Sequence, residues 1–174
     1  MKTNYMLFGR PGIGKTTLLI KIAEQLSALS IGGFFTREIR EKRVRVGFGI
    51  ETFAGESGTL ANVSYKAGPR VGKYGVNLSE FERIGVRALE NAVQDADVIL
   101  IDEIGRMELF SHNFRQVLVC ALDSEKPVIA TVMARPHPFA DRLKRRTDVQ
   151  LIEINLASRN SLSDKLAQRV KAAL

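Results

Sequence analysis

Short apolar runs alternate along the chain with segments whose apolar residues recur at helical spacing. The run Asn4–Phe8 is apolar and stops at a glycine-rich turn, which predicts a buried strand. Over Lys15–Leu29 the apolar positions have the period of a helix, and Gly32 and Gly33 are expected to break it. The chain is therefore predicted to begin with a strand and a helix that follows it directly.

Three β-rich segments come next, separated by turn residues: Phe34–Arg40, Val44–Phe53 and Thr59–Lys66. The second of them alternates apolar residues with polar or small ones, at Val44, Val46, Phe48 and Ile50. This alternation is typical of antiparallel strands with one face open to solvent. We therefore predict an antiparallel β insert after the first helix.

The second half of the chain returns to alternating helices and strands. Ser79 followed by Glu82 is typical of a capping box and predicts a helix through Val93. Val98–Ile101 is apolar without polar alternation, which indicates a central parallel strand covered on both faces. The remaining elements are predicted at about His112–Ser124 (helix), Pro127–Met133 (strand), Val149–Ile154 (strand) and Ser161–Leu174 (helix). Together they predict a three-layer α/β fold in one domain over residues 1–174.

Composition excludes several classes of protein. The chain has 174 residues, of which 45% are hydrophobic, and a mean hydropathy of -0.04, which does not fit a disordered chain. No apolar run reaches the roughly 18–20 residues of a membrane span, and the signal-peptide pattern is not present. Cys120, the only cysteine, lies in an apolar run and is expected to be buried. We therefore expect a cytoplasmic protein with no membrane segment.

The net charge of +7 invites an anionic partner. Basic residues gather at Arg37–Arg45 and at Arg142–Arg146, clusters that more often form solvated surfaces than nucleic-acid sites. Aromatic residues make up only 7% of the chain and tryptophan is absent, so no base-stacking platform is evident. Nucleic acid is therefore a partner that we do not favour, and the oligomeric state stays open, with a slight preference for a monomer.

A glycine-rich segment follows the first predicted strand. Residues 9–16 match the motif G-x-x-x-x-G-K-[ST], with an apolar strand before it and an amphipathic helix after it. Its glycines let backbone N–H groups surround a triphosphate, and the first helical turn adds further N–H groups. Lys15 supplies a charge between the β- and γ-phosphates, and Thr16 a hydroxyl for Mg²⁺. The residues expected to bind the nucleotide here are Gly9, Arg10, Pro11, Gly12, Ile13, Gly14, Lys15, Thr16 and Thr17.

Two acidic residues end the apolar strand of residues 98–101. Because ligands bind beyond the carboxyl ends of strands in open α/β sheets, Asp102 and Glu103 are expected at the same edge as the glycine-rich segment. Asp102 would hold Mg²⁺ opposite Thr16, directly or through water. Glu103 would accept a proton from the water that attacks the γ-phosphate, a role that favours hydrolysis over transfer.

A further cation is needed for the charge that develops on the γ-phosphoryl group. Arg10, Arg106 and Arg135 lie in predicted loops near the same sheet edge, and a plain surface role is equally open for each. We select Arg106 as the catalytic candidate beside Lys15 and Glu103. Thr131, a polar residue in an apolar run, either binds the attacking water or the γ-phosphate or is satisfied within the sheet.

Several longer stretches are more specific than these motifs: Asp102–Phe110, Gly33–Arg40, Arg45–Phe48 and Val71–Val76. With the glycine-rich segment, they make the chain resemble the small nucleoside-triphosphatase family first associated with thermophilic microbes, which includes a human cancer-related member. The resemblance runs nearly end to end. Arg10 stands where members often have an acid, and Arg106 where lysine is common.

The resemblance implies a RecA-like P-loop NTPase fold of the additional-strand, catalytic-glutamate type. It implies slow, Mg²⁺-dependent hydrolysis of several nucleoside triphosphates to diphosphates and phosphate, with little discrimination among the bases. It also implies that a second nucleotide-facing segment is formed by Leu100, Ile101, Asp102, Glu103, Ile104, Gly105, Arg106 and Met107.

Two other functions stay open at this point. A nucleotide or nucleoside kinase would use the arginine-rich segment 142–148 as a lid that closes over the phosphates and excludes water. A nucleotide-switched module that binds RNA or DNA would rest on the net charge alone. Glu103 favours the hydrolase, because a kinase needs no base for water at that position.

Overall fold

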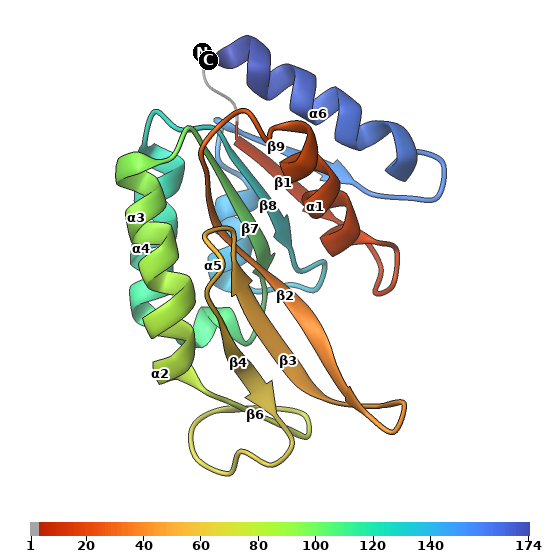
Figure 1. The fold of residues 1–174 in the computed structure, drawn as a ribbon, viewed down its shortest axis with the longest axis vertical. Helices are drawn as coiled ribbons and strands as arrows, with labels where there is room; N and C mark the ends of the chain where they lie inside the picture. The colour runs from red at the N-terminus through yellow and green to blue at the C-terminus, as the bar shows by residue number, and fades with distance from the viewer. Residues whose placement is uncertain (1–3) are drawn as a thin grey trace.

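One nine-stranded sheet runs through residues 4–174, the part of the chain that the computed structural model describes, with helices on both faces (Figure 1). The strand order is β5-β6-β4-β3-β2-β7-β8-β1-β9. The strands are β1 (Asn4–Phe8), β2 (Ile31–Glu41), β3 (Val44–Thr52), β4 (Ser57–Asn62), β5 (Arg70–Val71), β6 (Tyr74–Val76), β7 (Val98–Ile104), β8 (Val128–Val132) and β9 (Val149–Glu153).

Six α-helices accompany the sheet in residues 4–174: α1 (Lys15–Gln25), α2 (Leu78–Phe81), α3 (Arg87–Asp95), α4 (His112–Asp123), α5 (Pro138–Lys144) and α6 (Arg159–Ala173). A π-helical segment, Glu82–Val86, joins α2 to α3, and a 3₁₀ turn, Glu108–Phe110, precedes α4. None of the helices in this part of the chain is long and apolar enough to cross a membrane.

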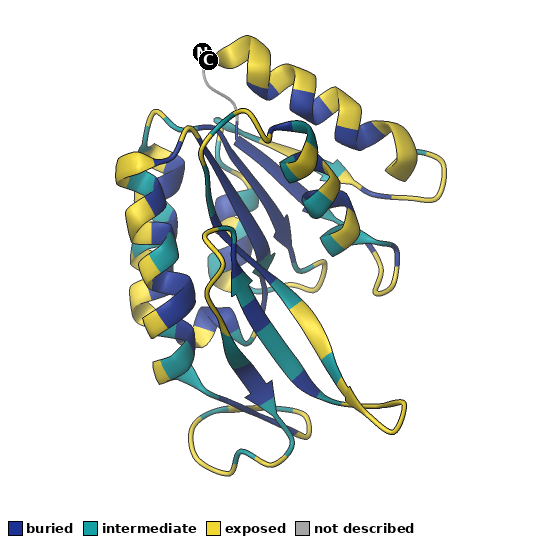
Figure 2. Cartoon of the chain, viewed as in Figure 1, coloured by how far each residue is buried: buried dark blue, intermediate teal, exposed yellow. Residues whose placement is uncertain are grey.

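The central strands β1, β7 and β8 are buried on both faces, as Figure 2 shows by colour, whereas the edge strand β9 is largely exposed. Strands β2, β7, β8, β1 and β9 are parallel neighbours. Ile99 and Ile101 of β7 pack in the same core cluster as residues of α3 and α4, whereas Val98 and Leu100 pack with residues of α1 and α6. Because successive side chains point to opposite faces, an apolar run without polar alternation fits this position. The predicted three-layer α/β fold is confirmed.

The other half of the sheet is antiparallel. Strand β3 pairs with β2, β4 with β3, β6 with β4, and β5 with β6, each antiparallel. The strand predicted over Thr59–Lys66 is too long, because β4 ends at Asn62. The Asn62 side chain accepts hydrogen bonds from the backbone N–H and the hydroxyl of Ser64, which turns the chain away from the sheet.

Gly32 and Gly33 do not end the first helix as predicted; helix α1 stops at Gln25 and both glycines lie inside β2. A Cβ on Gly32 would overlap that of Ala92 in α3, and a Cβ on Gly33 would overlap the carbonyl oxygen of Leu100. Glycine is therefore needed at both positions, because α3 and β7 approach β2 closely there. Local residue preferences do not reveal such a contact between distant segments.

The predicted capping box at Ser79 is wrong. The helix begins at Leu78, and the Asn77 side chain caps it by accepting a hydrogen bond from the Glu80 N–H at 3.1 Å. Glu82 does not reach back to Ser79; its carboxylate accepts a hydrogen bond from the Ser111 hydroxyl at 2.7 Å. The Glu82 side chain therefore bonds to Ser111, the residue before α4, instead of forming the capping-box hydrogen bond that the sequence predicts.

Two features of this face of the sheet differ from what the sequence indicated: one helix was not predicted, and one prediction fails. The basic segment before β9 is partly helical, because His137 caps α5 and Pro138 occupies its first turn. Cys120 is exposed rather than buried. Helix α4 turns Phe114, Leu118 and other apolar residues toward the core, which leaves Cys120 on the solvent side.

Candidate active site

The glycine loop, residues 9–16, connects β1 directly to α1. Gly12 and Gly14 have φ angles of 78° and 103°, in the left-handed region that glycine adopts without strain. Gly14 occupies the position before the helix, and no side chain among residues 4–174 caps this helix start. The Lys15 ammonium donates to the Gly9 carbonyl at 2.8 Å, across the loop. The loop thus combines open backbone N–H groups with a positive charge.

Asp102 lies at the centre of a hydrogen-bond network formed by four elements. Its Oδ2 accepts from the hydroxyl of Thr16 in α1 at 2.6 Å and from the backbone N–H and hydroxyl of Thr36 in β2 at 3.4 Å each. Its Oδ1 accepts from the hydroxyl of Thr131 in β8 at 2.7 Å. The carboxylate is 2% exposed. The network holds Asp102 against the start of α1, where the sequence predicts it.

Two more carboxyl groups lie beside Asp102. Burial raises the pKa of Glu103, the Lys15 ammonium opposes this increase, and the charge of Asp102 adds to it. Glu108 is 5% exposed, and its burial, together with the charge of Glu103, holds its pKa well above the usual range. A Cβ on Gly105 would lie 2.7 Å from Glu103 Oε1 and 2.9 Å from Glu108 Oε2. Glycine at 105 therefore leaves room for both carboxyl groups.

These groups line one cleft of about 670 Å³. Its walls are Pro11, Gly12, Lys15 and Thr16 of the glycine loop and α1, Thr36, Arg37 and Glu38 of β2, the acidic segment with Asp102, Glu103, Arg106, Met107 and Glu108, and Phe48, Leu60 and Val71 of the antiparallel strands. The cleft brings together all three residues predicted to be catalytic and both predicted magnesium ligands.

Pro11, Gly12 and Met107 of the predicted nucleotide-binding residues also line the cleft, whereas several others do not. Leu100, Ile101 and Ile104 are fully buried in the core and do not line the cleft. Thr17 is exposed on α1. Of the three candidate arginines, Arg106 lines the cleft, Arg10 lines a smaller cavity of about 410 Å³ with Ile13 and residues 153–157, and Arg135 lines neither cavity.

Thr36 and Glu108 are cleft residues that sequence reasoning did not single out. Each is a polar residue within a stretch that carries the family resemblance, and Thr36 follows the apolar pair Phe34-Phe35 as Asp102 follows its own apolar run. A polar side chain directly after an apolar run was thus a usable signal for Thr36, which lies inside β2. Glu108 offered no such signal, because its proximity to Glu103 depends on the turn between them.

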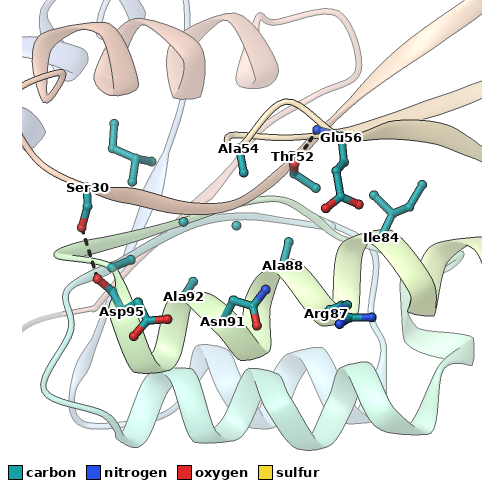
Figure 3. A pocket seen from close by; sticks show the side chains of 14 residues that line it. Ser30, Thr52, Ala54, Glu56, Ile84, Arg87, Ala88, Asn91, Ala92 and Asp95 are labelled. Carbon is teal, nitrogen blue, oxygen red and sulfur yellow. Dashed lines mark hydrogen bonds between the residues drawn. The ribbon is translucent and has the colours of Figure 1, made fainter.

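A third cavity, of about 200 Å³, lies between α3 and β2 (Figure 3). Its floor is formed by small residues, among them Gly32, Ala88 and Ala92, and its rim carries Glu56 and Asp95. Thr52, which also lines it, is satisfied by the N–H of Glu56 at 3.0 Å. The groups suited to phosphate chemistry are therefore gathered in the larger cleft.

The arginine-rich segment 142–148 begins in α5 and ends beside the first residue of β1, at the opposite end of this strand from the glycine loop. Asp148 accepts from the N–H of Asn4 at the start of β1, whereas the glycine loop follows the end of this strand. Arg146 forms ion pairs with Asp123 at 2.6 Å and with Asp148 at 2.8 Å. This position gives no support to a lid over the phosphates, and so none to the kinase alternative.

A cation can be accommodated between Thr16 and Asp102. No group of three or more His, Cys, Asp or Glu residues able to hold a metal occurs in residues 4–174. Mg²⁺, however, usually takes only one or two protein oxygens and completes its octahedron with phosphate oxygens and water. The hydroxyl and carboxylate pair beside the glycine loop fits that donor set.

Fold and site define a three-layer α/β protein with a glycine loop facing a cluster of carboxyl groups. Residues 4–167 match the NTPase family profile. The nucleoside-triphosphatase THEP1 of Thermotoga maritima is 48% identical over 166 residues, which cover 95% of this chain and 94% of the relative. THEP1 of Thermofilum pendens is 46% identical over 173 residues, with 96% and 94% covered. The chain therefore belongs to this NTPase family, as its resemblance predicted.

Solved structures agree with this assignment. The crystal structure of THEP1 from the hyperthermophile Aquifex aeolicus superposes with a TM-score of 0.88 at 36% identity and covers 98% of this chain and 99% of its own. The solution structure of a human cancer-related nucleoside triphosphatase gives a TM-score of 0.84 at 33% identity, with 99% of both chains covered.

Proposed function

We propose that the chain is a Mg²⁺-dependent nucleoside-triphosphate phosphohydrolase that converts triphosphates to diphosphates and phosphate. The observation that carries this proposal is the convergence of Lys15, Asp102 and Glu103 on one cleft at the start of α1. The backbone N–H groups of the glycine loop and the Lys15 ammonium would hold the β- and γ-phosphates. Thr16 and Asp102 would hold Mg²⁺, which when bound neutralises charge on these phosphates.

The chemical step assigned to the protein is activation of water. Glu103 would accept a proton as the oxygen of water forms a bond to the γ-phosphorus and the bond from that phosphorus to the β-γ bridging oxygen breaks. The raised pKa of Glu103 suits this role, because a base works best when its pKa lies nearer the working pH. Arg106, on the wall of the same cleft, would stabilise the charge that develops on the γ-phosphoryl group.

The strand order supports assignment to the additional-strand, catalytic-glutamate type of P-loop NTPase. Strand β8 lies between β1, which leads to the glycine loop, and β7, which carries Asp102 and Glu103. We further propose little discrimination among bases, as the family resemblance implies, because the groups assigned to nucleotide binding, the backbone N–H groups of the glycine loop and the Lys15 ammonium, would bind the phosphates.

The proposal is tested by following the γ-phosphate of ATP, GTP, CTP and UTP with and without Mg²⁺. We expect free phosphate from each of them, only when Mg²⁺ is present, and no label on added nucleosides or monophosphates. Lys15→Ala should abolish both binding and turnover, because it removes the charge that holds the phosphates. Phosphate release that continues at the wild-type rate in Lys15→Ala, or label on an acceptor, would overturn the assignment.

A further inference from the structure

The net positive charge of the protein is concentrated at one end. Residues 37–45 hold five basic and two acidic side chains, and residues 63–75 hold three basic and none acidic, so the two segments account for +6 of the net +7. They are joined in space: Arg45 donates to the Tyr74 hydroxyl at 2.8 Å, and the Val63 N–H donates to the Val46 carbonyl at 2.8 Å. We call these two segments the basic pole.

The hairpin of β2 and β3 projects from the body at this pole (Figure 1). From Gly47 onward β3 is also paired with β4, whereas residues 40–45 form a free two-stranded ribbon in which every residue is exposed. Figure 2 colours this tip as exposed. The ribbon is therefore available to a partner without any rearrangement of the fold.

The turn of this hairpin keeps two cations where glycine or asparagine would be favoured. Lys42 and Arg43 have φ angles of 48° and 66°, so both occupy the left-handed region. A two-residue turn of this kind strongly prefers Asn-Gly or a similar pair, since other L residues are strained there. Lysine and arginine stand here despite this preference, and they place two positive charges at the tip of the hairpin.

Several cations of the pole lack a carboxylate partner. Glu38 pairs with Arg40 at 2.7 Å and with Arg45 at 3.2 Å, and Glu51 pairs with Arg37 at 2.9 Å. Within residues 4–174, no ion pair is formed by Lys42, Arg43, Lys66, Arg70 or Lys73. Lys66 and Arg70 donate to backbone carbonyls, but no carboxylate in this part of the chain neutralises any of the five charges, so they can attract a polyanion.

The shape and the aromatic residues of the pole favour a duplex over a single strand. Tyr74, only 7% exposed, and the neighbouring Phe48 lie beside the Arg45 guanidinium, which is 5.6 Å and 5.1 Å from their ring centres. Tyr65, the other aromatic residue of the pole, is half-buried, so no ring of the pole is fully open to stacked bases. The major groove of B-form DNA admits a two-stranded β-ribbon, whereas the deep, narrow major groove of A-form RNA does not.

We propose that the basic pole binds the phosphate backbone of duplex DNA, independently of base sequence, with the free tip of the β2–β3 hairpin in the major groove. This inference goes beyond the proposed hydrolysis and does not depend on it. Binding of this kind is driven by the release of counterions from the DNA. The logarithm of the binding constant therefore falls linearly with the logarithm of the salt concentration.

The test is fluorescence anisotropy of a short labelled DNA duplex with the full chain, without nucleotide, over about 50–200 mM salt. The variant Lys42→Asn with Arg43→Gly removes two charges and gives the turn the residues it prefers, so its fold is retained. Lys165→Gln with Lys171→Gln is the matched control, since it removes two exposed charges from α6, at the other end of the molecule (Figure 1).

We expect the hairpin variant to bind the duplex about ten-fold more weakly and its salt slope to fall by about 2, roughly one for each lost phosphate contact. The control variant should match the wild type. Lys66→Gln with Lys73→Gln, in the second segment, should weaken binding by a similar factor.

Four results would overturn the proposal: no binding of the duplex at low salt, equal loss in the control variant, binding of single-stranded DNA or duplex RNA at least as tight as that of duplex DNA, and equally tight binding of anionic lipid vesicles. Circular dichroism of each variant separates loss of the surface from loss of the fold.

Discussion

Two regions of this protein hold charged side chains in opposite surroundings. In the cleft, Asp102 is 2% exposed and receives hydrogen bonds from Thr16 and Thr131 at 2.6 and 2.7 Å. On the hairpin, the Glu38 side chain is 43% exposed although it contacts two arginines at similar distances. Water screens the second arrangement and not the first. Contacts of comparable length therefore contribute different energies in the two regions. Substitutions in the buried cleft should have larger effects than substitutions on the exposed hairpin.

The largest effect is expected for Glu103→Gln. The amide keeps the size of the side chain and cannot accept the proton, so turnover should fall by about 10²- to 10⁴-fold while binding of the nucleotide is largely retained. Phosphate release and calorimetric binding measure the two quantities. Glu41→Gln makes the same chemical change on the exposed hairpin and should hydrolyse normally. Normal turnover in Glu103→Gln would remove the base assignment.

Glu108 should make stability depend on pH. Because its pKa in the folded protein is raised, the unfolded chain releases this proton first as pH increases, and stability then falls until pH passes the raised folded value. Below about pH 4, where both states are protonated, the group contributes no slope. Glu108→Gln should therefore gain stability relative to the wild type as pH rises.

Urea unfolding at several pH values, without nucleotide or metal, measures this difference. Part of the slope should persist in Glu108→Gln, because the pKa of Glu103 is raised as well. Glu41→Gln serves again as the exposed control. Parallel pH profiles for the wild type and Glu108→Gln would contradict the raised pKa of Glu108.

Thr131→Val tests the network around Asp102. The substitution leaves Oδ1 of a buried carboxylate without its hydroxyl donor, and we expect a loss of about 1–3 kcal/mol in the free energy of unfolding. Thr131→Ser, which keeps the hydroxyl, should recover most of this loss. Denaturation midpoints of the wild type, Thr131→Val and Thr131→Ser measure this loss and its recovery. Equal stability of the Thr131→Val and Thr131→Ser variants would show that the hydrogen bond contributes nothing.

The smallest effect is expected for Glu38→Gln on the hairpin. It removes two exposed ion pairs, with Arg40 and Arg45, and should change the free energy of unfolding by no more than about 1 kcal/mol, less at high salt. Thermal unfolding at two salt concentrations measures it. A loss as large as that of Thr131→Val would contradict the contrast between the two regions.

Much of the centre of the sheet was predictable from the sequence, because β1, β7 and β8 are apolar on both faces and the helices that cover them are amphipathic. The strand Asn4–Phe8 has the predicted bounds, and the glycine-rich motif between it and α1 identifies one edge of the cleft without any knowledge of packing. Asp102 follows from the same logic, since it ends an apolar strand beside that edge.

What the sequence could not predict depends on contacts between distant segments. Asn77 rather than Ser79 caps α2, and Glu82 accepts a hydrogen bond from Ser111, 29 residues away, instead of completing a capping box. Gly32 and Gly33 act as close-packing positions in β2, although glycine pairs usually indicate turns. Glu108 enters the site only because the turn at Gly105 brings it back to Glu103.

The central claim is that the glycine loop and Lys15 grip a magnesium-bound triphosphate next to Glu103. Calorimetric titration of Mg-ATP into the Glu103→Gln variant, which should bind without consuming its ligand, tests this most directly. We predict saturable heat at one site per chain, absent when Lys15→Ala is added to the same variant. No heat with the folded Glu103→Gln protein, or equal heat with and without the lysine, would contradict the account.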